Sequence, residues 1–297
     1  MDLIISDVTK EFDGFKAVDH FSFHLSCGVY GLLGVNGAGK TTLMRMLTTL
    51  MKPTTGCITW DGEDIFAMEG RYRSLLGYLP QDFGYYPDFS VYDYLMYIAA
   101  LKGIRPAVAK QRVKKLLRQV GLAEARHKKM KTLSGGMKRR AGIAQAMLNN
   151  PKILILDEPT AGLDPSERIR FRNLISELSA DRIVLLSTHI VSDVEFMAGQ
   201  IILMKKGEFV ATGTPEELIE KCPNHSWICS VPKNQVDDYC MKYQVANVRT
   251  LADHAKLRIL SENMPIPGAV LEETTLEDVF LSYFGERSGD ERDHDMV

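Results

Sequence analysis

One stretch near the N-terminus has glycines, a lysine and a threonine in the spacing of a phosphate-binding loop. Residues 34–41 are G-V-N-G-A-G-K-T, which satisfies the pattern G-x-x-x-x-G-K-[ST]. Glycines let backbone N–H groups turn inward around a β-phosphate, and the helix that follows adds its positive N-terminal dipole. Lys40 would neutralise β- and γ-phosphate oxygens, and Thr41 would be a ligand of Mg²⁺. The predicted phosphate contacts are Gly34, Val35, Asn36, Gly37, Ala38, Gly39, Lys40, Thr41 and Thr42.

A second glycine-containing stretch, L-S-G-G-M at residues 133–137, lies directly before a predicted helix. Ser134 can cap that helix, while the N–H groups of Gly135 and Gly136 face outward at its positive end. Taken alone, such a stretch is more often an ordinary serine cap than a phosphate site. The first loop alone would equally fit a GTPase, a kinase, a helicase or a motor, so the order of the motifs has to discriminate.

Two apolar runs end abruptly in polar residues. Residues 153–156 lead into Asp157 and Glu158, and residues 183–186 lead into a short polar segment that ends at His189. Uninterrupted apolar runs of this length are typical of buried parallel strands. Ligands of open α/β sheets bind at the carboxyl ends of the strands. These polar residues are therefore candidate site residues.

In this order, the motifs resemble those of the ABC ATPases over roughly residues 1 to 220. The resemblance implies that Asp157 holds the Mg²⁺ shell and that Glu158 is the general base for the attacking water. It also implies that Gln81 senses the metal and the γ-phosphate, and that His189 contacts the γ-phosphate. Without the shared order, a lone histidine is more often structural, and a lone glutamine is more often a solvated loop residue.

The same resemblance implies contacts to the nucleotide base. Phe12 corresponds to the aromatic residue that stacks on adenine, although the family more often has tyrosine there, and Val18 lies where an apolar contact is expected. Asp164 is placed among the residues that contact nucleotide. Each has a structural alternative, since Phe12 could pack in the core and Asp164 with Pro165 suits a helix cap.

The resemblance further implies an oligomer. In ABC ATPases two subunits pair head to tail, so that ATP on Lys40 and Thr41 of one copy is closed over by the L-S-G-G segment of the other. Ser134, Gly135 and Gly136 are therefore expected to bind the nucleotide of a second subunit. A homodimer follows as the expected partner arrangement, with ATP and Mg²⁺ at its interface.

Composition limits the possible partners. The chain has 297 residues, and its 36 Lys and Arg nearly balance 38 Asp and Glu for a net charge of -2, so direct nucleic-acid binding is not expected. No stretch approaches the roughly 20 apolar residues that span a bilayer, and the N-terminus lacks the features of a secretory signal. The five cysteines are far apart, which favours reduced thiols. We expect a peripheral protein on the cytoplasmic side of the cell membrane, bound to a separate transmembrane permease.

Periodicity and composition divide the chain. We expect a nucleotide-binding domain over 1–220 with a helical subdomain at about 82–150, an accessory domain over 221–287, and an unstructured tail over 288–297. The predicted fold class is α/β. It comprises a P-loop NTPase (RecA-like) core with a mostly parallel sheet, an N-terminal antiparallel β subdomain, an inserted α-helical subdomain and a small α+β C-terminal domain.

Finer details resemble the ATPases of drug, antimicrobial-peptide and lipid exporters. These details are G-L-L-G before the phosphate loop, L-S-G-G-M-K-R-R, and T-L-E-D-V-F-L-S-Y-F-G near the C-terminus. The expected function is ATP hydrolysis that powers export through the permease. Two alternatives stay open: a soluble ABC ATPase that acts on ribosomes or nucleic acid, and an importer ATPase. A P-loop GTPase is disfavoured because the chain has no N-K-x-D motif.

Overall fold

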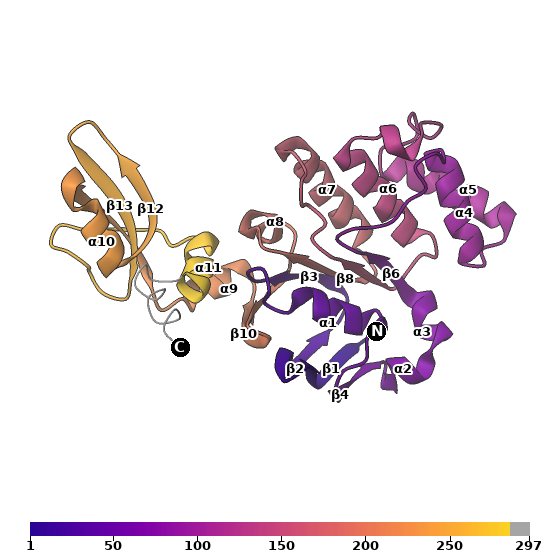
Figure 1. Cartoon of the computed structure of the whole chain (residues 1–297), viewed down its shortest axis with the longest axis horizontal. Coiled ribbons are helices and arrows are strands. Elements are labelled where there is room, and N and C mark those ends of the chain that lie inside the picture. Colours follow the sequence, from indigo (N-terminus) through magenta and orange to yellow (C-terminus); the bar gives the residue numbers. More distant parts are fainter. Residues whose placement is uncertain (286–297) are drawn as a thin grey trace. The chain divides into compact units, whose positions relative to one another are not determined.

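The computed structural model describes residues 1–285, which form two compact units (Figure 1). The first unit is Met1–Thr212, and the second begins at Gly213. The boundary expected from the sequence lies after residue 220. Helix α9 (Pro215–Glu220) instead belongs to the second unit, where it contacts α11 (Leu276–Phe284). The tail expected at 288–297 lies outside the described residues.

A four-stranded antiparallel sheet occupies the N-terminal part of the first unit, with the strand order β2-β1-β4-β5. Its long β1–β2 hairpin turns at Asp13 and Gly14, which both have positive φ angles, as the right-handed twist of a hairpin favours. The strands are β1 (Leu3–Phe12), β2 (Phe15–Leu25), β4 (Thr55–Trp60) and β5 (Glu63–Asp64).

The central sheet has six strands in the order β10-β9-β3-β8-β7-β6. The strands from β9 to β6 pair in parallel. Two of the inner strands, β7 and β8, are buried at every residue, as their uninterrupted apolar runs predict. The strands are β3 (Gly28–Leu33), β6 (Leu76–Leu79), β7 (Ile153–Leu156), β8 (Ile183–Thr188), β9 (Gln200–Lys205) and β10 (Glu208–Gly213). The predicted mostly parallel α/β core is confirmed.

Helices complete the first unit. Helix α4 is capped by Ser90, whose Oγ accepts a hydrogen bond from the N–H of Asp93 at 3.1 Å. In Figure 1, α4, α5 and α6 gather into the helical subdomain at one end of the unit. The helices are α1 (Lys40–Leu47), α2 (Ile65–Met68), α3 (Gly70–Leu75), α4 (Val91–Leu101), α5 (Pro106–Gln119), α6 (Gly135–Met147), α7 (Pro165–Leu178) and α8 (Val191–Glu195).

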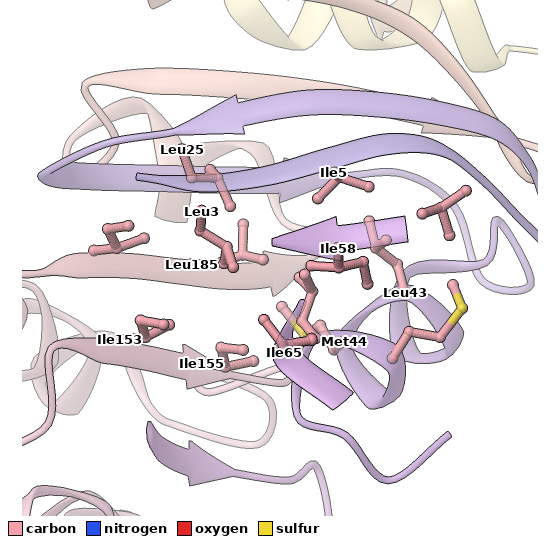
Figure 2. Close-up of a cluster of buried hydrophobic side chains, with 14 of the residues drawn as sticks. Leu3, Ile5, Leu25, Leu43, Met44, Ile58, Ile65, Ile153, Ile155 and Leu185 are labelled. Atoms are coloured by element: carbon pink, nitrogen blue, oxygen red, sulfur yellow. The ribbon is translucent and has the colours of Figure 1, made fainter. Parts of the chain in front are cut away.

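The main core lies between the two sheets and surrounds α1 (Figure 2). Leu3, Ile5 and Ile58 come from the antiparallel sheet, whereas Ile155 and Leu185 come from the parallel sheet, and all are at most 3% exposed. Burying side chains of this size contributes about 1.5–3 kcal/mol each. Because α1 follows the phosphate loop directly, this packing fixes the position of the loop.

The second unit has a four-stranded antiparallel sheet in the order β12-β13-β11-β14. Its core is small and includes Cys229, Leu257 and Ile259, each fully buried. Helix α11 has Thr275 as its N-cap, with a reciprocal cap between Thr275 and Asp278. The remaining elements are β11 (His225–Pro232), α10 (Val236–Lys242), β12 (Gln244–Thr250), β13 (His254–Ser261) and β14 (Val270–Glu272).

Candidate nucleotide site

The carboxyl ends of four neighbouring strands meet at one edge of the central sheet. Strand β3 pairs in parallel with β8, β8 with β7, and β7 with β6. The segments that leave these strands carry the phosphate loop after β3, His189 after β8, Asp157 after β7 and Gln81 after β6. This edge is where open α/β sheets bind ligands.

Two glycines of the phosphate loop cannot be replaced without a clash. A Cβ on Gly34 would lie 2.3 Å from the carbonyl oxygen of Met204, and one on Gly39 would lie 2.1 Å from that of Ala17. Gly39 also has φ +100°, a conformation that L side chains rarely adopt. Gly37, at φ +80°, has open space beside it. The loop can therefore pack tightly at both ends while its middle stays accessible.

Lys40, the first residue of α1, is buried against the loop that precedes it. Its Nζ donates hydrogen bonds to the carbonyl oxygens of Gly34 at 2.6 Å and Val35 at 3.0 Å, and it lies 3.8 Å from Oε1 of Glu158. Burial lowers the pKa of Lys40, and the carboxylates of Glu158 and Asp157 oppose this shift. A buried ammonium group held by two carbonyls is ready to pair with an incoming anion.

Asp157 is 1% exposed and is oriented by hydroxyl groups. Ser187 Oγ donates a hydrogen bond to Asp157 Oδ1 at 2.6 Å, and Thr41 Oγ1 donates to the same oxygen at 3.4 Å. Hydroxyl and carboxylate oxygens are the ligands that Mg²⁺ prefers, and it commonly takes only one or two carboxylates beside substrate phosphates. The pair Thr41 and Asp157 fits such an ion.

Glu158 is the buried carboxylate nearest to the loop lysine. Its φ of +45° is unusual for a residue other than glycine, and its N–H donates a hydrogen bond to Ser187 Oγ at 2.9 Å. Oε2 of Glu158 lies 3.0 Å from Nδ1 of His189, which is 45% exposed. The hydroxyl of Ser187 therefore donates a hydrogen bond to the Asp157 carboxylate and accepts one from the Glu158 backbone, so that it positions both residues.

A cavity of about 500 Å³ brings most of the predicted residues together. Glu158, His189 and Gln81 line it together with the phosphate loop, and Phe15 lines it as well. Phe12 is 42% exposed but does not line the cavity. Val18 is fully buried in the core, so its side chain is not accessible to a base in this structure. The lining residues are Phe15, Ala17, Asn36, Gly37, Ala38, Gly39, Lys40, Thr41, Thr42, Gln81, Glu158 and His189.

The predicted nucleotide contacts at the N-termini of α6 and α7 also lie outside this cavity. Ser134 caps α6 by accepting a hydrogen bond from the N–H of Met137 at 3.2 Å, and it is exposed together with Gly135. Gly136 is buried, and a Cβ there would lie 2.8 Å from the Glu167 carboxylate. The remaining contact, Asp164, caps α7, and the hydrogen bonds from the Glu167 N–H and from the Ser166 hydroxyl lower the pKa of its exposed carboxyl.

One residue of the site was not expected from the sequence. Arg139 of α6 is 7% exposed, and its guanidinium donates hydrogen bonds to five carbonyl oxygens of two separate loops. The acceptors are Pro80 at 3.1 Å, Gln81 at 2.8 Å, Asp157 at 2.5 Å, Glu158 at 2.7 Å and Pro159 at 2.9 Å.

Arg139 thus ties the loop after β6 to the loop after β7. Burial lowers the pKa of its guanidinium to about 10, although the nearby acidic residues oppose the shift. A sequence signal existed, because Arg139 shares the buried face of α6 with Ile143 and Ala146 at helical spacing. A charged residue on an apolar helix face needs buried partners.

The fold and this site define a nucleotide-binding protein of the P-loop ATPase class. Residues 18–161 match the family described as ABC transporter. The chain is 35% identical, over 94% of its length and 85% of the relative, to the ABC transporter ATP-binding protein YxlF of Bacillus subtilis (strain 168). The chain belongs to the ATP-binding proteins of the ABC transporter family, which hydrolyse ATP.

Further similarities cover about three quarters of the chain. The Nod factor export ATP-binding protein I of Burkholderia thailandensis is 39% identical over 72% of this chain and 71% of that protein. The linearmycin resistance ATP-binding protein LnrL of Bacillus subtilis is 34% identical over 72% of this chain and 70% of that protein. The solved structure of cbiO1 from Clostridium perfringens superposes with a TM-score of 0.68 at 28% identity, covering 74% of this chain and 90% of that one.

Within residues 1–285, no helix has the length and hydropathy needed to cross a bilayer.

Proposed function

We propose that this chain hydrolyses ATP in the 500 Å³ cavity to power export through a separate transmembrane permease. The observation that carries the catalytic part is the meeting of Lys40, Glu158 and His189 at the phosphate loop. Support for the export direction comes from the relatives named for Nod factor export and linearmycin resistance. The expected location is the cytoplasmic face of the cell membrane, where such a subunit would be peripheral.

In the proposed reaction, the loop N–H groups and Lys40 bind the phosphates of ATP. Lys40 exchanges its two carbonyl partners for phosphate oxygens when the nucleotide enters. Glu158 orients a water molecule in line with the γ-phosphate and accepts its proton, while His189 contacts the γ-phosphate. Base stacking is assigned to Phe12, whose exposed ring is free of the core.

Thr41 and Asp157 are proposed to hold Mg²⁺, with Gln81 as a further contact from the loop after β6. When bound, the ion would neutralise negative charge on the β- and γ-phosphates. Ser187 and Arg139 contribute by keeping Asp157 and the neighbouring backbone in place.

The site is proposed to be completed by a second copy of the chain. Ser134, Gly135 and Gly136 lie at the N-terminus of α6, a position that binds anions, yet they do not line the cavity of their own subunit. A head-to-tail homodimer would place them, with Asp164, over the nucleotide of the partner. Closure and release of this dimer would drive the permease.

The catalytic assignment is tested with Glu158→Gln. We expect kcat to fall by about 10²–10⁴-fold, the contribution of a positioned base, while equilibrium ATP binding is retained. Glu177→Gln is the matched control because Glu177 is exposed on α7, outside the cavity. A Glu158→Gln protein that turns over ATP at the normal rate would disprove the assignment.

The oligomer and partner require separate measurements. The Glu158→Gln protein should dimerise on size-exclusion chromatography only with ATP, and adding Ser134→Arg should abolish dimerisation without weakening ATP binding. The tagged chain should copurify with a permease from solubilised membranes, identified by mass spectrometry. Recovery with ribosomes instead would favour the soluble-ATPase alternative and overturn the export proposal.

A further inference from the structure

A strongly basic segment lies in the helical subdomain, away from the nucleotide cavity. Residues 102–131 contain 11 Lys and Arg but only one acidic residue, Glu124, in a chain whose net charge is -2. The segment comprises α5 and the turns that follow it. Such an excess of one sign attracts anions to that surface.

Part of this segment surrounds a second cavity of about 610 Å³, which we name the α5 basin. Lys110, Lys114 and Arg118 line it from successive turns of α5, and Arg126 and His127 line it from the turn after the helix. Apolar atoms of Tyr92, Leu117 and Ala123 complete its surface, and Glu124 is its one acidic residue. The α5 basin therefore combines a cationic rim with apolar surface.

Of the five cations of α5, the three that line the basin form no ion pair with an acidic residue within residues 1–285. Like charges at positions i and i+4 destabilise a helix, so Lys110, Lys114 and Arg118 weaken α5 unless an anion lies nearby. Two other lysines of the same segment are neutralised differently, since Lys129 and Lys131 both pair with Asp88, at 3.4 Å and 2.7 Å. Lys110, Lys114 and Arg118 have no such carboxylate, and all three line the α5 basin.

We propose that the α5 basin binds a phosphate ester that carries an apolar group, as an anionic phospholipid does. Lysine and arginine donors match phosphate oxygens, and the partly exposed Tyr92 and Ala123 provide apolar surface for the attached hydrocarbon. The choice of a lipid as the source of this phosphate rests on the proposed membrane association. The phosphate chemistry rests only on the residues of the α5 basin.

The test is direct binding of monomeric dihexanoyl-phosphatidylglycerol to the full chain by calorimetry. A non-hydrolysable ATP analogue with Mg²⁺ fills the nucleotide cavity, so that phosphate binding there does not contribute. Lys110→Gln/Lys114→Gln should weaken binding roughly 30-fold, from the usual contribution of two lysines beside an anionic lipid. Lys115→Gln/Lys128→Gln is the matched control, because it removes the same charge from exposed residues outside the α5 basin. It should weaken binding less than about threefold.

Equal losses in the two double variants would mean general surface attraction and would overturn the site. Equal affinity for dihexanoyl-phosphatidylcholine would show that the negative charge of the lipid does not contribute to binding. Equal affinity for inorganic phosphate would show that the apolar group does not contribute. Sedimentation with phosphatidylglycerol vesicles should follow the same order of variants, and its failure would exclude a bilayer as the source.

Basal ATPase activity separates this proposal from the proposed function. Both double variants should hydrolyse ATP at the unaltered rate, because neither pair of lysines lines the nucleotide cavity. Neither variant should fail to fold, since each reduces like-charge repulsion and is expected to leave the melting temperature unchanged or raised. If the chain binds lipid but no permease copurifies from membranes, the proposed function is wrong and the proposed lipid site is unaffected.

Discussion

Replacing Arg139 with lysine tests whether one buried guanidinium positions the catalytic residues. Lysine keeps the positive charge but presents three donors on a point charge in place of the planar fork. Because Arg139 donates to five carbonyl oxygens, at least two of them would lose their partner. Each buried acceptor left unpaired costs about 1–3 kcal/mol, so the substitution should cost at least about 2 kcal/mol of stability.

For a unit of this size, a loss of about 2 kcal/mol lowers the melting temperature by roughly 4–8 °C. The effect on catalysis should be larger than this shift suggests, because a displacement of about 1 Å at a reacting group can cost about 10²-fold. We therefore expect kcat to fall about 10²-fold at a temperature where the variant is fully folded. KM for ATP should change less than about threefold, because none of the five carbonyl oxygens that Arg139 binds belongs to the phosphate loop.

The assay is steady-state ATP hydrolysis paired with a thermal melt, and Arg182→Lys is the control. Arg182 is 8% exposed, close to the 7% of Arg139, but it precedes β8 at the opposite end of that strand from the site. Arg182→Lys should lower the melting temperature while leaving kcat unaltered. Equal kcat losses in the two variants, or a normal kcat in Arg139→Lys, would refute the positioning role.

Two other perturbations address the base contact and the second unit. Phe12→Ala should raise KM for ATP about fivefold, the lower end of what stacking on a base contributes, and Phe15→Ala should not; the reverse result would move the contact to Phe15. Burial raises the pKa of Asp278, but hydrogen bonds from Arg258, Thr275 and Ser226 outweigh this effect and lower it. The ionised carboxylate therefore contributes its full stabilisation above pH about 4, the pKa of an aspartate in the unfolded chain. That stability should be lost as pH falls through the lowered pKa, and Asp278→Asn should remove this acid dependence. The fluorescence of a variant with Trp227 as its sole tryptophan would show either result.

Much of the nucleotide site was predictable because local sequence decides it. Glycine spacing before Lys40 and the apolar run that ends at Asp157 place both residues at one sheet edge, as the parallel pairing then requires. Ser134 was expected to cap its helix, and a cap was the alternative to a nucleotide contact for Asp164. Both side chains accept the N–H groups that a cap requires. Such features depend on residues within one turn or one strand.

Features that depend on distant segments escaped prediction. The role of Arg139 requires knowing that α6 passes the ends of both β6 and β7, and no local pattern encodes this. Val18 lies between Ala17 and Asp19 on β2, and only the packing of the two sheets shows that its side chain faces the core. The α5 basin likewise forms only when the turn after α5 folds back.

Helix α6 has a consequence for the coupling between two subunits. Its N-terminal end presents Ser134 to the proposed partner's nucleotide, and one turn later Arg139 holds the catalytic loops of its own subunit. Because α6 contacts both sites, ATP binding at the partner's site can change the geometry of the catalytic loops in the subunit that contains α6. The two sites are then coupled by a free energy. Thermodynamic linkage then requires the effect to be reciprocal, so a dimer built this way would bind its two ATP molecules cooperatively.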